Sequence, residues 1–160
     1  MPDIFLFLFN ILFLIILSGF FSSSETALTA VSEARIHELA LQGNKRAITI
    51  ESILEKKEKM ISTILIGNNL VNIVASVYAT SFAIIYFGEF DLIFVTILLT
   101  IVLVIFAEVI PKTYAFSHAD QVALTVAPII NFFILSLFVK IIVKFLFVFF
   151  KNLMNSKSEF

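Results

Sequence analysis

Apolar residues along this chain gather into four long stretches, and polar residues gather between them. A helix needs about 20 mostly apolar residues to cross the hydrocarbon core of a membrane. The pattern predicts transmembrane helices over about 4–31, 61–87 and 92–110. The fourth stretch, about 122–150, contains Pro128 near its start and regularly spaced lysines near its end. That pattern favours a juxtamembrane helix, and a fourth full crossing is the alternative.

The segment between the first two spans, about 32–60, holds most of the charged residues, with both signs interleaved. Its apolar positions recur at helical spacing on either side of Gln42-Gly43-Asn44. This predicts two short amphipathic helices in a solvated hairpin on the membrane surface. The expected fold is an all-α integral membrane domain over 1–150, followed by a tail over 151–160.

Composition strengthens the membrane assignment and excludes several classes of protein. Hydrophobic residues make up 60% and charged residues 14%, against roughly 45–50% and 25% in soluble chains. Cysteine is absent, which excludes thiol catalysis and thiolate metal sites. A net charge of −1 gives no general attraction to nucleic acid, so we expect no nucleic-acid partner. The two histidines, His37 and His118, lie far apart and are expected at the surface.

Charges at the ends of the spans predict the orientation. The first stretch has Asp3 as its only early charge, so it lacks the basic start of a signal peptide and is expected to be a retained span. Lysine and arginine concentrate in 32–60 and after the third span, whereas the loop near 88–91 has acids and no base. The positive-inside rule therefore predicts a cytoplasmic hairpin and C-terminus, with the N-terminus outside.

Each predicted span carries polar residues at helical spacing along one side. These are Ser18, Ser22 and Thr26 in the first span, Asn68, Asn72, Ser76 and Thr80 in the second, and Thr96, Thr100 and Glu108 in the third. Residues four apart stack on one face of a helix. Serine and threonine stripes are typical of helix packing. Ala75, Ala79 and Ala83 form a small-residue ridge suited to a helix–helix or dimer surface.

Helix packing alone does not explain an acid at position 108. An acid near the bilayer costs several kcal/mol unless it is neutral, paired or bound to a cation. Lys112, one turn later, is a possible partner. Pro111 has no N–H, so the carbonyl of Ala107 is expected to lie free beside the carboxylate. Carboxylate, carbonyl, amide and hydroxyl oxygens suit a hard cation such as Mg²⁺, Ca²⁺ or Na⁺, and a single carboxylate favours release.

Three motifs carry a family resemblance. They are SGFFSSSETAL over 18–28, GNNLVN over 67–72 and EVIPKT over 108–113. In this order, with a charged hairpin between the first two, they resemble the transmembrane module of the CorC/cyclin M (CNNM) magnesium transporters over about 17–128. Phe106 and Ala107 stand where many members have a glycine before the acid.

The resemblance implies a homodimer in the lipid bilayer, with a largely dehydrated Mg²⁺ held by side chains from all three spans. The positions that match the family's metal ligands are Ser18, Ser22, Asn68, Asn72 and Glu108. It further implies Mg²⁺ efflux in exchange for Na⁺, a location in a bacterial inner membrane, and cytoplasmic CBS-type domains in a full-length chain.

Two functions remain open on the residues. The first is a transporter that exposes the cation site alternately to the two sides of the membrane. The second is a membrane-embedded sensor or scaffold, whose bound ion regulates attached cytoplasmic domains without being moved. We do not expect an enzyme, because the spans contain no nucleophile–base pair and no catalytic metal cluster.

Overall fold

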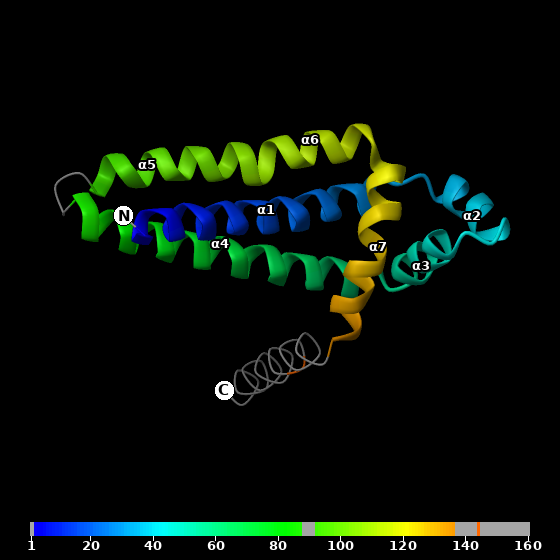
Figure 1. The fold of residues 1–160 in the computed structure, drawn as a ribbon. Helices are drawn as coiled ribbons and strands as arrows, with labels where there is room; N and C mark the ends of the chain where they lie inside the picture. Colours follow the sequence, from blue (N-terminus) through cyan, green and yellow to red (C-terminus); the bar gives the residue numbers. More distant parts are fainter. Residues whose placement is uncertain (1, 88–91, 137–143, 145–160) are drawn as a thin grey trace, which may run out of the picture.

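The computed structural model describes residues 2–87, 92–136 and 144, and its elements over the first two of these ranges are all helices. In chain order they are α1 (Pro2–Ala30), α2 (Glu33–Leu41), α3 (Lys45–Leu54), α4 (Lys57–Phe87), α5 (Leu92–Leu103), the π-helix η1 (Val104–Val109), α6 (Ile110–Ser117) and α7 (Ala119–Leu135). Figure 1 shows α1, α4 and the continuous α5–η1–α6 rod running side by side. Helix α7 crosses one end of this bundle, and the α2–α3 hairpin lies beyond it; we call this the hairpin end.

Three helical segments are long and apolar enough to cross a membrane: Ile4–Ala30, Lys57–Tyr86 and Thr96–Ser117. Large apolar side chains project from them, including Phe5, Ile73 and Leu98, which are 75%, 62% and 62% exposed. Such surfaces suit lipid tails rather than water. The predicted all-α membrane fold is confirmed, and the chain is a multi-pass membrane protein.

The third span extends beyond its predicted end. We expected it to stop at Ile110 because proline follows, but η1 and α6 continue the helix through Pro111 to Ser117. A proline ring clashes with the carbonyl four residues earlier in an α-helix. The π turn directly before Pro111 adds a residue to the turn and so moves this carbonyl out of the way. The helix therefore continues past Ile110, the predicted end of the third span.

The hairpin breaks where the sequence predicted. Gly43 has a φ of 84°, a left-handed conformation that glycine adopts without strain. The Asn44 side-chain oxygen then caps α3 by accepting from the N–H groups of Arg46 and Ala47, at 3.0 and 3.3 Å. These two residues stop α2 and start α3, so the turn is determined locally.

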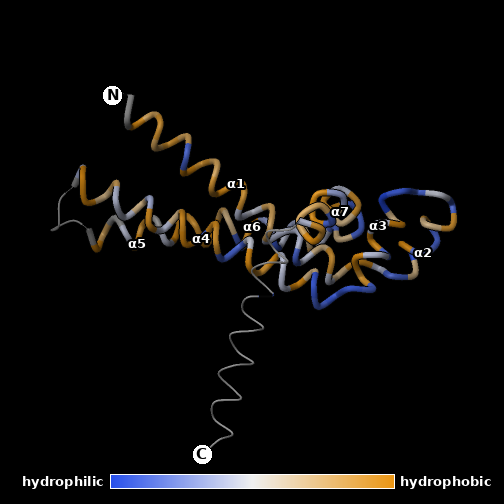
Figure 2. The backbone as a smooth tube through the Cα atoms, turned by 90° about the horizontal axis from the view of Figure 1, so that it is seen from below, coloured by the Kyte–Doolittle hydropathy of each residue, from blue (hydrophilic) through white to orange (hydrophobic). Residues whose placement is uncertain are grey.

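Helix α7 runs across the hairpin end of the bundle in Figure 1 and is seen almost end-on in Figure 2, so it does not run alongside the three long helices. It begins at Ala119 rather than 122 and ends at Leu135, where Ser136 has an extended backbone with ψ of 134°. The predicted helix over 122–150 is thus interrupted at Ser136. Its remainder lies outside the described residues, apart from Lys144.

The main apolar core lies beneath α7. It joins residues of α1, α3, α4 and α7, among them Leu28, Ile50, Ile64 and Ile130, all fully buried. The apolar side of the predicted hairpin contributes Ile36, Ile50 and Ile53 to this core, and α3 packs against α7. The hairpin is therefore packed into the domain.

A smaller core lies at the opposite end of the bundle. Phe7 and Ile11 of α1 pack there against Ala75 and Ala79 of α4. Ala83, one turn further along α4, is also fully buried. Within the chain, the alanine ridge is therefore a helix–helix contact, because small side chains let α1 approach α4 closely.

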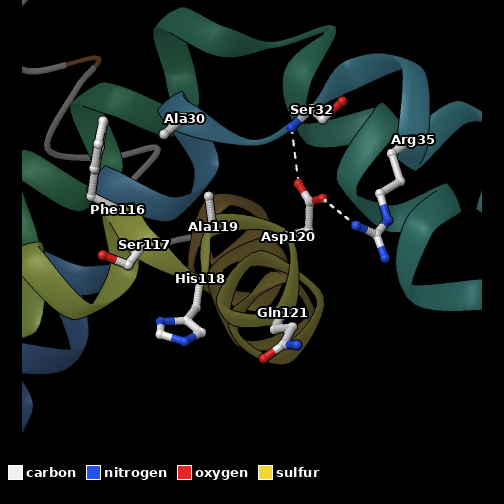
Figure 3. Close-up of a pocket in the computed structure, with 9 residues that line it drawn as sticks. All are labelled: Ala30, Ser32, Arg35, Phe116, Ser117, His118, Ala119, Asp120 and Gln121. Carbon is white, nitrogen blue, oxygen red and sulfur yellow. Dashed lines mark hydrogen bonds and ion pairs between the residues drawn. The ribbon is translucent and has the colours of Figure 1, made fainter.

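Asp120 fastens the hairpin to α7. Its Oδ1 accepts from the Ser32 N–H at 3.0 Å, and its Oδ2 lies 3.5 Å from the Arg35 guanidinium, as Figure 3 shows. Ser32 precedes α2, and Arg35 lies within it. The Asp120 carboxylate, in the first turn of α7, thus binds both the backbone just before α2 and a side chain within α2.

Gly67 is expected to be intolerant of a side chain. A Cβ at this position would lie 2.6 Å from the Phe21 ring, whereas one at Gly19 would lie 3.1 Å from the Pro111 side chain. Gly67→Ala should lower the free energy of unfolding by about 1–3 kcal/mol, because the ring must move. Thermal unfolding in detergent, followed by circular dichroism, measures this, with Gly19→Ala as the milder control. Wild-type stability of Gly67→Ala would contradict the close packing of Phe21 on α4.

Candidate cation site

The polar residues of α1 face the centre of the bundle. Helix α1 contacts α4, η1, α6 and α7, so it is the central helix of the fold. Ser18 and Ser22 are fully buried on it, and Asn68 of α4 is 8% exposed. Asn72 and Glu108 are partly buried. All five predicted site residues therefore lie on helices that meet at α1.

Oxygens from α1 and α4 converge at Ser18. Its hydroxyl donates to Oδ1 of Asn72 at 2.6 Å and lies 3.2 Å from Oδ1 of Asn68. A serine hydroxyl has one proton, so it cannot fully satisfy two amide oxygens at once. One of the two amide oxygens is therefore left without a full hydrogen bond from Ser18, and a cation could bind to it.

Asn72 connects α1 to the third span. Its Nδ2 donates to Oε1 of Glu108 at 3.2 Å, while its Oδ1 accepts from Ser18. Because both ends of the amide are engaged, its orientation is fixed. The structure thus links Ser18, Asn68, Asn72 and Glu108 in one hydrogen-bonded chain.

Ser22 is the fifth predicted residue, one turn along α1 from Ser18. Its Oγ is fully buried and has no hydrogen-bond partner among the described residues. A buried hydroxyl without a partner costs about 1–3 kcal/mol. Its position on the same side of the helix as Ser18 adds a further unsatisfied oxygen to this region.

The π turn places Glu108 and alters the backbone beside it. The Ile110 N–H donates to the carbonyl of Ile105 instead of that of Phe106. The next residue, Pro111, has no N–H, so the carbonyl of Phe106 lacks both an α-helical and a π-helical donor. It lies 3.8 Å from the position that a Cβ on Gly19 would occupy, hence directly against α1. The sequence had pointed instead to the carbonyl of Ala107.

Lys112 does not pair with Glu108 in this structure. Its Nζ lies 3.7 Å from Oε2 of Glu25 on α1. Asn72 is the only hydrogen-bonding partner of the Glu108 side chain within the described part of the chain. The alternative in which Lys112 neutralises Glu108 is therefore not the arrangement observed, and no lysine or arginine of the described residues forms an ion pair with this carboxylate.

The donor set consists entirely of oxygen: one carboxylate, two amide oxygens and two hydroxyls. The described residues contain no cluster of three or more His, Asp or Glu side chains. His37 and His118 are both exposed, as predicted. A set of this kind suits a hard cation held by a single charge, rather than a tightly bound transition metal.

Comparison with known proteins assigns the family. A family model described as the cyclin M transmembrane N-terminal domain matches residues 9–159. The chain belongs to this family. The match includes all three motifs and all five residues of the candidate site, so the resemblance predicted from the motifs is confirmed.

Several relatives share this cyclin M domain. A UPF0053 protein of Haemophilus influenzae is 44% identical over 109 residues, which are 68% of this chain and 26% of the relative. The UPF0053 inner membrane protein YfjD of Escherichia coli is 41% identical over 107 residues, 67% of this chain and 25% of the relative. A chloroplastic DUF21 domain-containing protein of Arabidopsis thaliana is 32% identical over 107 residues, 67% of this chain and 16% of the relative. The chain thus spans about a quarter or less of the length of these curated relatives.

Three features of this region were not predicted from the sequence: the π turn, the Phe106 carbonyl and the Glu25–Lys112 ion pair. Pro111 signalled an irregular helix but not its form. Glu25 and Lys112 each follow a site residue by about one turn, which places them in one layer beside the site. The sequence shows that spacing, but it does not show that Glu25 on α1 faces Lys112 on α6.

Ser22→Ala in this cyclin M domain is expected to leave stability unchanged, or to raise it by up to about 1 kcal/mol, because the hydroxyl makes no hydrogen bond. Ser18→Ala is the matched comparison. It should lower stability by about 1–2 kcal/mol by leaving Asn72 Oδ1 without its donor. Thermal unfolding with a chelator present measures both. A large loss of stability for Ser22→Ala would mean that its hydroxyl has a partner within the protein.

Proposed function

We propose that this cyclin M domain transports Mg²⁺ out of the cytoplasm, in exchange for Na⁺, through a dehydrated oxygen site between its three spans. The observation that carries the proposal is a group of buried oxygens whose hydrogen bonding is incomplete. Ser22 has no hydrogen-bond partner among the described residues, and one Ser18 proton faces two amide oxygens. Buried polar groups are almost always satisfied, so unsatisfied ones call for a ligand.

The five residues of the site would supply three kinds of ligand oxygen. Glu108 supplies the negative charge, and Asn68 and Asn72 supply amide oxygens. Ser18 and Ser22 supply hydroxyl oxygens that replace part of the ion's water shell. Mg²⁺ gives up its water reluctantly, so several oxygens must be in place before it enters.

A single carboxylate also explains how the ion leaves. A transported ion must be bound strongly enough to enter and weakly enough to depart. Two or three carboxylates would hold a divalent ion in an apolar bundle much more tightly. With one charge and four neutral ligands, a small movement of α1 relative to η1 would be enough to disperse the site.

The surroundings of the site follow from the same proposal. We place the hairpin end in the cytoplasm because of its lysines and arginines, and the N-terminus outside. The domain would act as a homodimer in a bacterial inner membrane. Cytoplasmic CBS-type domains would accompany it in a longer chain.

Glu108→Gln is expected to weaken Mg²⁺ binding about tenfold or more, because it removes the only charge of the site while keeping its shape. Asn68→Ala should also weaken binding. Calorimetric titration of the purified protein with Mg²⁺ measures both effects. Glu58→Gln, an exposed acid in the first turn of α4, is the matched control and should bind as wild type does. Unchanged affinity in both site variants would refute the assignment of the site.

A measurement of Mg²⁺ flux distinguishes a transporter from the alternative function, a membrane-embedded sensor. Proteoliposomes loaded with a Mg²⁺-sensitive dye should report saturable Mg²⁺ movement that depends on Glu108 and responds to an opposing Na⁺ gradient. Binding that is lost in Glu108→Gln, without flux in the wild type, would instead favour a membrane-embedded sensor whose ion regulates attached domains. Flux that ignores the Na⁺ gradient would remove only the exchange part of the proposal.

A further inference from the structure

An ion pair between Glu25 and Lys112 lies beside the candidate site. Lys112 Nζ lies 3.7 Å from Glu25 Oε2, and Lys112 follows Glu108 by about one turn. On α1, Glu25 likewise follows Ser22 by about one turn. The Glu25–Lys112 pair therefore forms the layer next to the site on its hairpin side.

We infer that Lys112 is a movable counterion that pairs with Glu25 when a cation occupies the site and with Glu108 when the site is empty. The inference rests on the proposed function, because it assumes that Glu108 binds the transported ion. Lys112 then acts as a positioning residue that sets how tightly the ion is held. Glu25 acts only through Lys112.

The charge count motivates this alternation. Glu25 and Glu108 carry two negative charges, and Lys112 carries one positive charge. One carboxylate is therefore always left over, and an unpaired carboxylate at membrane depth is costly. In the observed arrangement the remaining carboxylate is Glu108, whose hydrogen-bonding partner is the neutral Asn72 amide. This is the arrangement that the inference assigns to the cation-bound site, because Lys112 leaves the Glu108 carboxylate free to act as a ligand.

The geometry allows the movement. A lysine has a flexible four-carbon stem, and its ammonium group can reach a residue one turn earlier on the same helix. The Lys112 and Glu25 side chains are 43% and 33% exposed, so neither is locked in a packed core. Breaking such a partly exposed pair costs little, because its net strength is about 0–1 kcal/mol.

The test depends on effects of opposite sign. Lys112→Gln removes the competitor for Glu108, so Mg²⁺ affinity should rise about two- to fivefold, the range expected for partly exposed ion pairs. Glu25→Gln frees Lys112 to occupy Glu108, so affinity should fall by a similar factor. The double variant should match Lys112→Gln, because Glu25 has no effect once the lysine is gone. Lys112→Arg should restore nearly wild-type affinity.

Controls distinguish this mechanism from general effects of charge and folding. Arg35→Gln removes another cation from an ion pair at the hairpin end, with Asp120, and should leave Mg²⁺ affinity unchanged. Glu25→Gln and Lys112→Gln break the same ion pair, so a purely structural role would change affinity in the same direction in both. All variants are compared by calorimetric Mg²⁺ titration, with thermal unfolding as the check of folding.

Three results would overturn the inference: shifts of the same sign in the two single variants, wild-type affinity in both, or a Glu25→Gln effect that persists in the double variant. Its failure is separable from that of the proposed function. If Glu108→Gln abolishes Mg²⁺ binding while these variants behave as wild type, only the counterion is refuted. If Glu108→Gln binds Mg²⁺ normally, the site assignment itself fails.

Discussion

The charge of a carboxylate within an apolar helical bundle is costly unless hydrogen bonds or a cation stabilise it. The hydrogen bonds around Glu108 follow from that constraint. Asn72 donates to Glu108 and accepts from Ser18, so one amide joins the three spanning helices through a single hydrogen-bonded chain. In an apolar surrounding each of these bonds is costly to leave unmade. The same groups that would hold a cation therefore also set the register of the helices.

Backbone irregularity lets the helices approach closely enough for this chain to form. The π turn of η1 contains Glu108, three residues before Pro111, and Gly19 lets that proline pack against α1. Gly67 does the same for the Phe21 ring on α4. Gly19, Gly67 and Pro111 each lie within one of the three sequence motifs, beside the polar residues of the candidate site. The packing of the helices and the placement of these polar residues therefore depend on each other.

The hairpin end is stabilised mainly by apolar packing rather than by a buried polar network. Its core is a conventional apolar cluster, closed by α7 and fastened by Asp120 to Ser32 and Arg35. Helix α7 contacts α1, α3 and α4, so it touches both the spans and the hairpin. If the distance between α1 and α4 changed, α7 would have to shift with them. The hairpin would then move too, because α3 packs directly against α7.

The sequence by itself predicted the three long apolar spans, the break at Gly43 and Asn44, and the identity of the candidate ligands. Hydrophobic length, turn chemistry and helical periodicity are local properties, so they can be predicted without coordinates. Only the tertiary structure decided that Lys112 pairs with Glu25, that Ser22 has no hydrogen-bond partner among the described residues, that α7 crosses the end of the bundle, and that the third long helix continues through Pro111. These outcomes depend on which helix faces which, and periodicity fixes the face of a helix but not its neighbour.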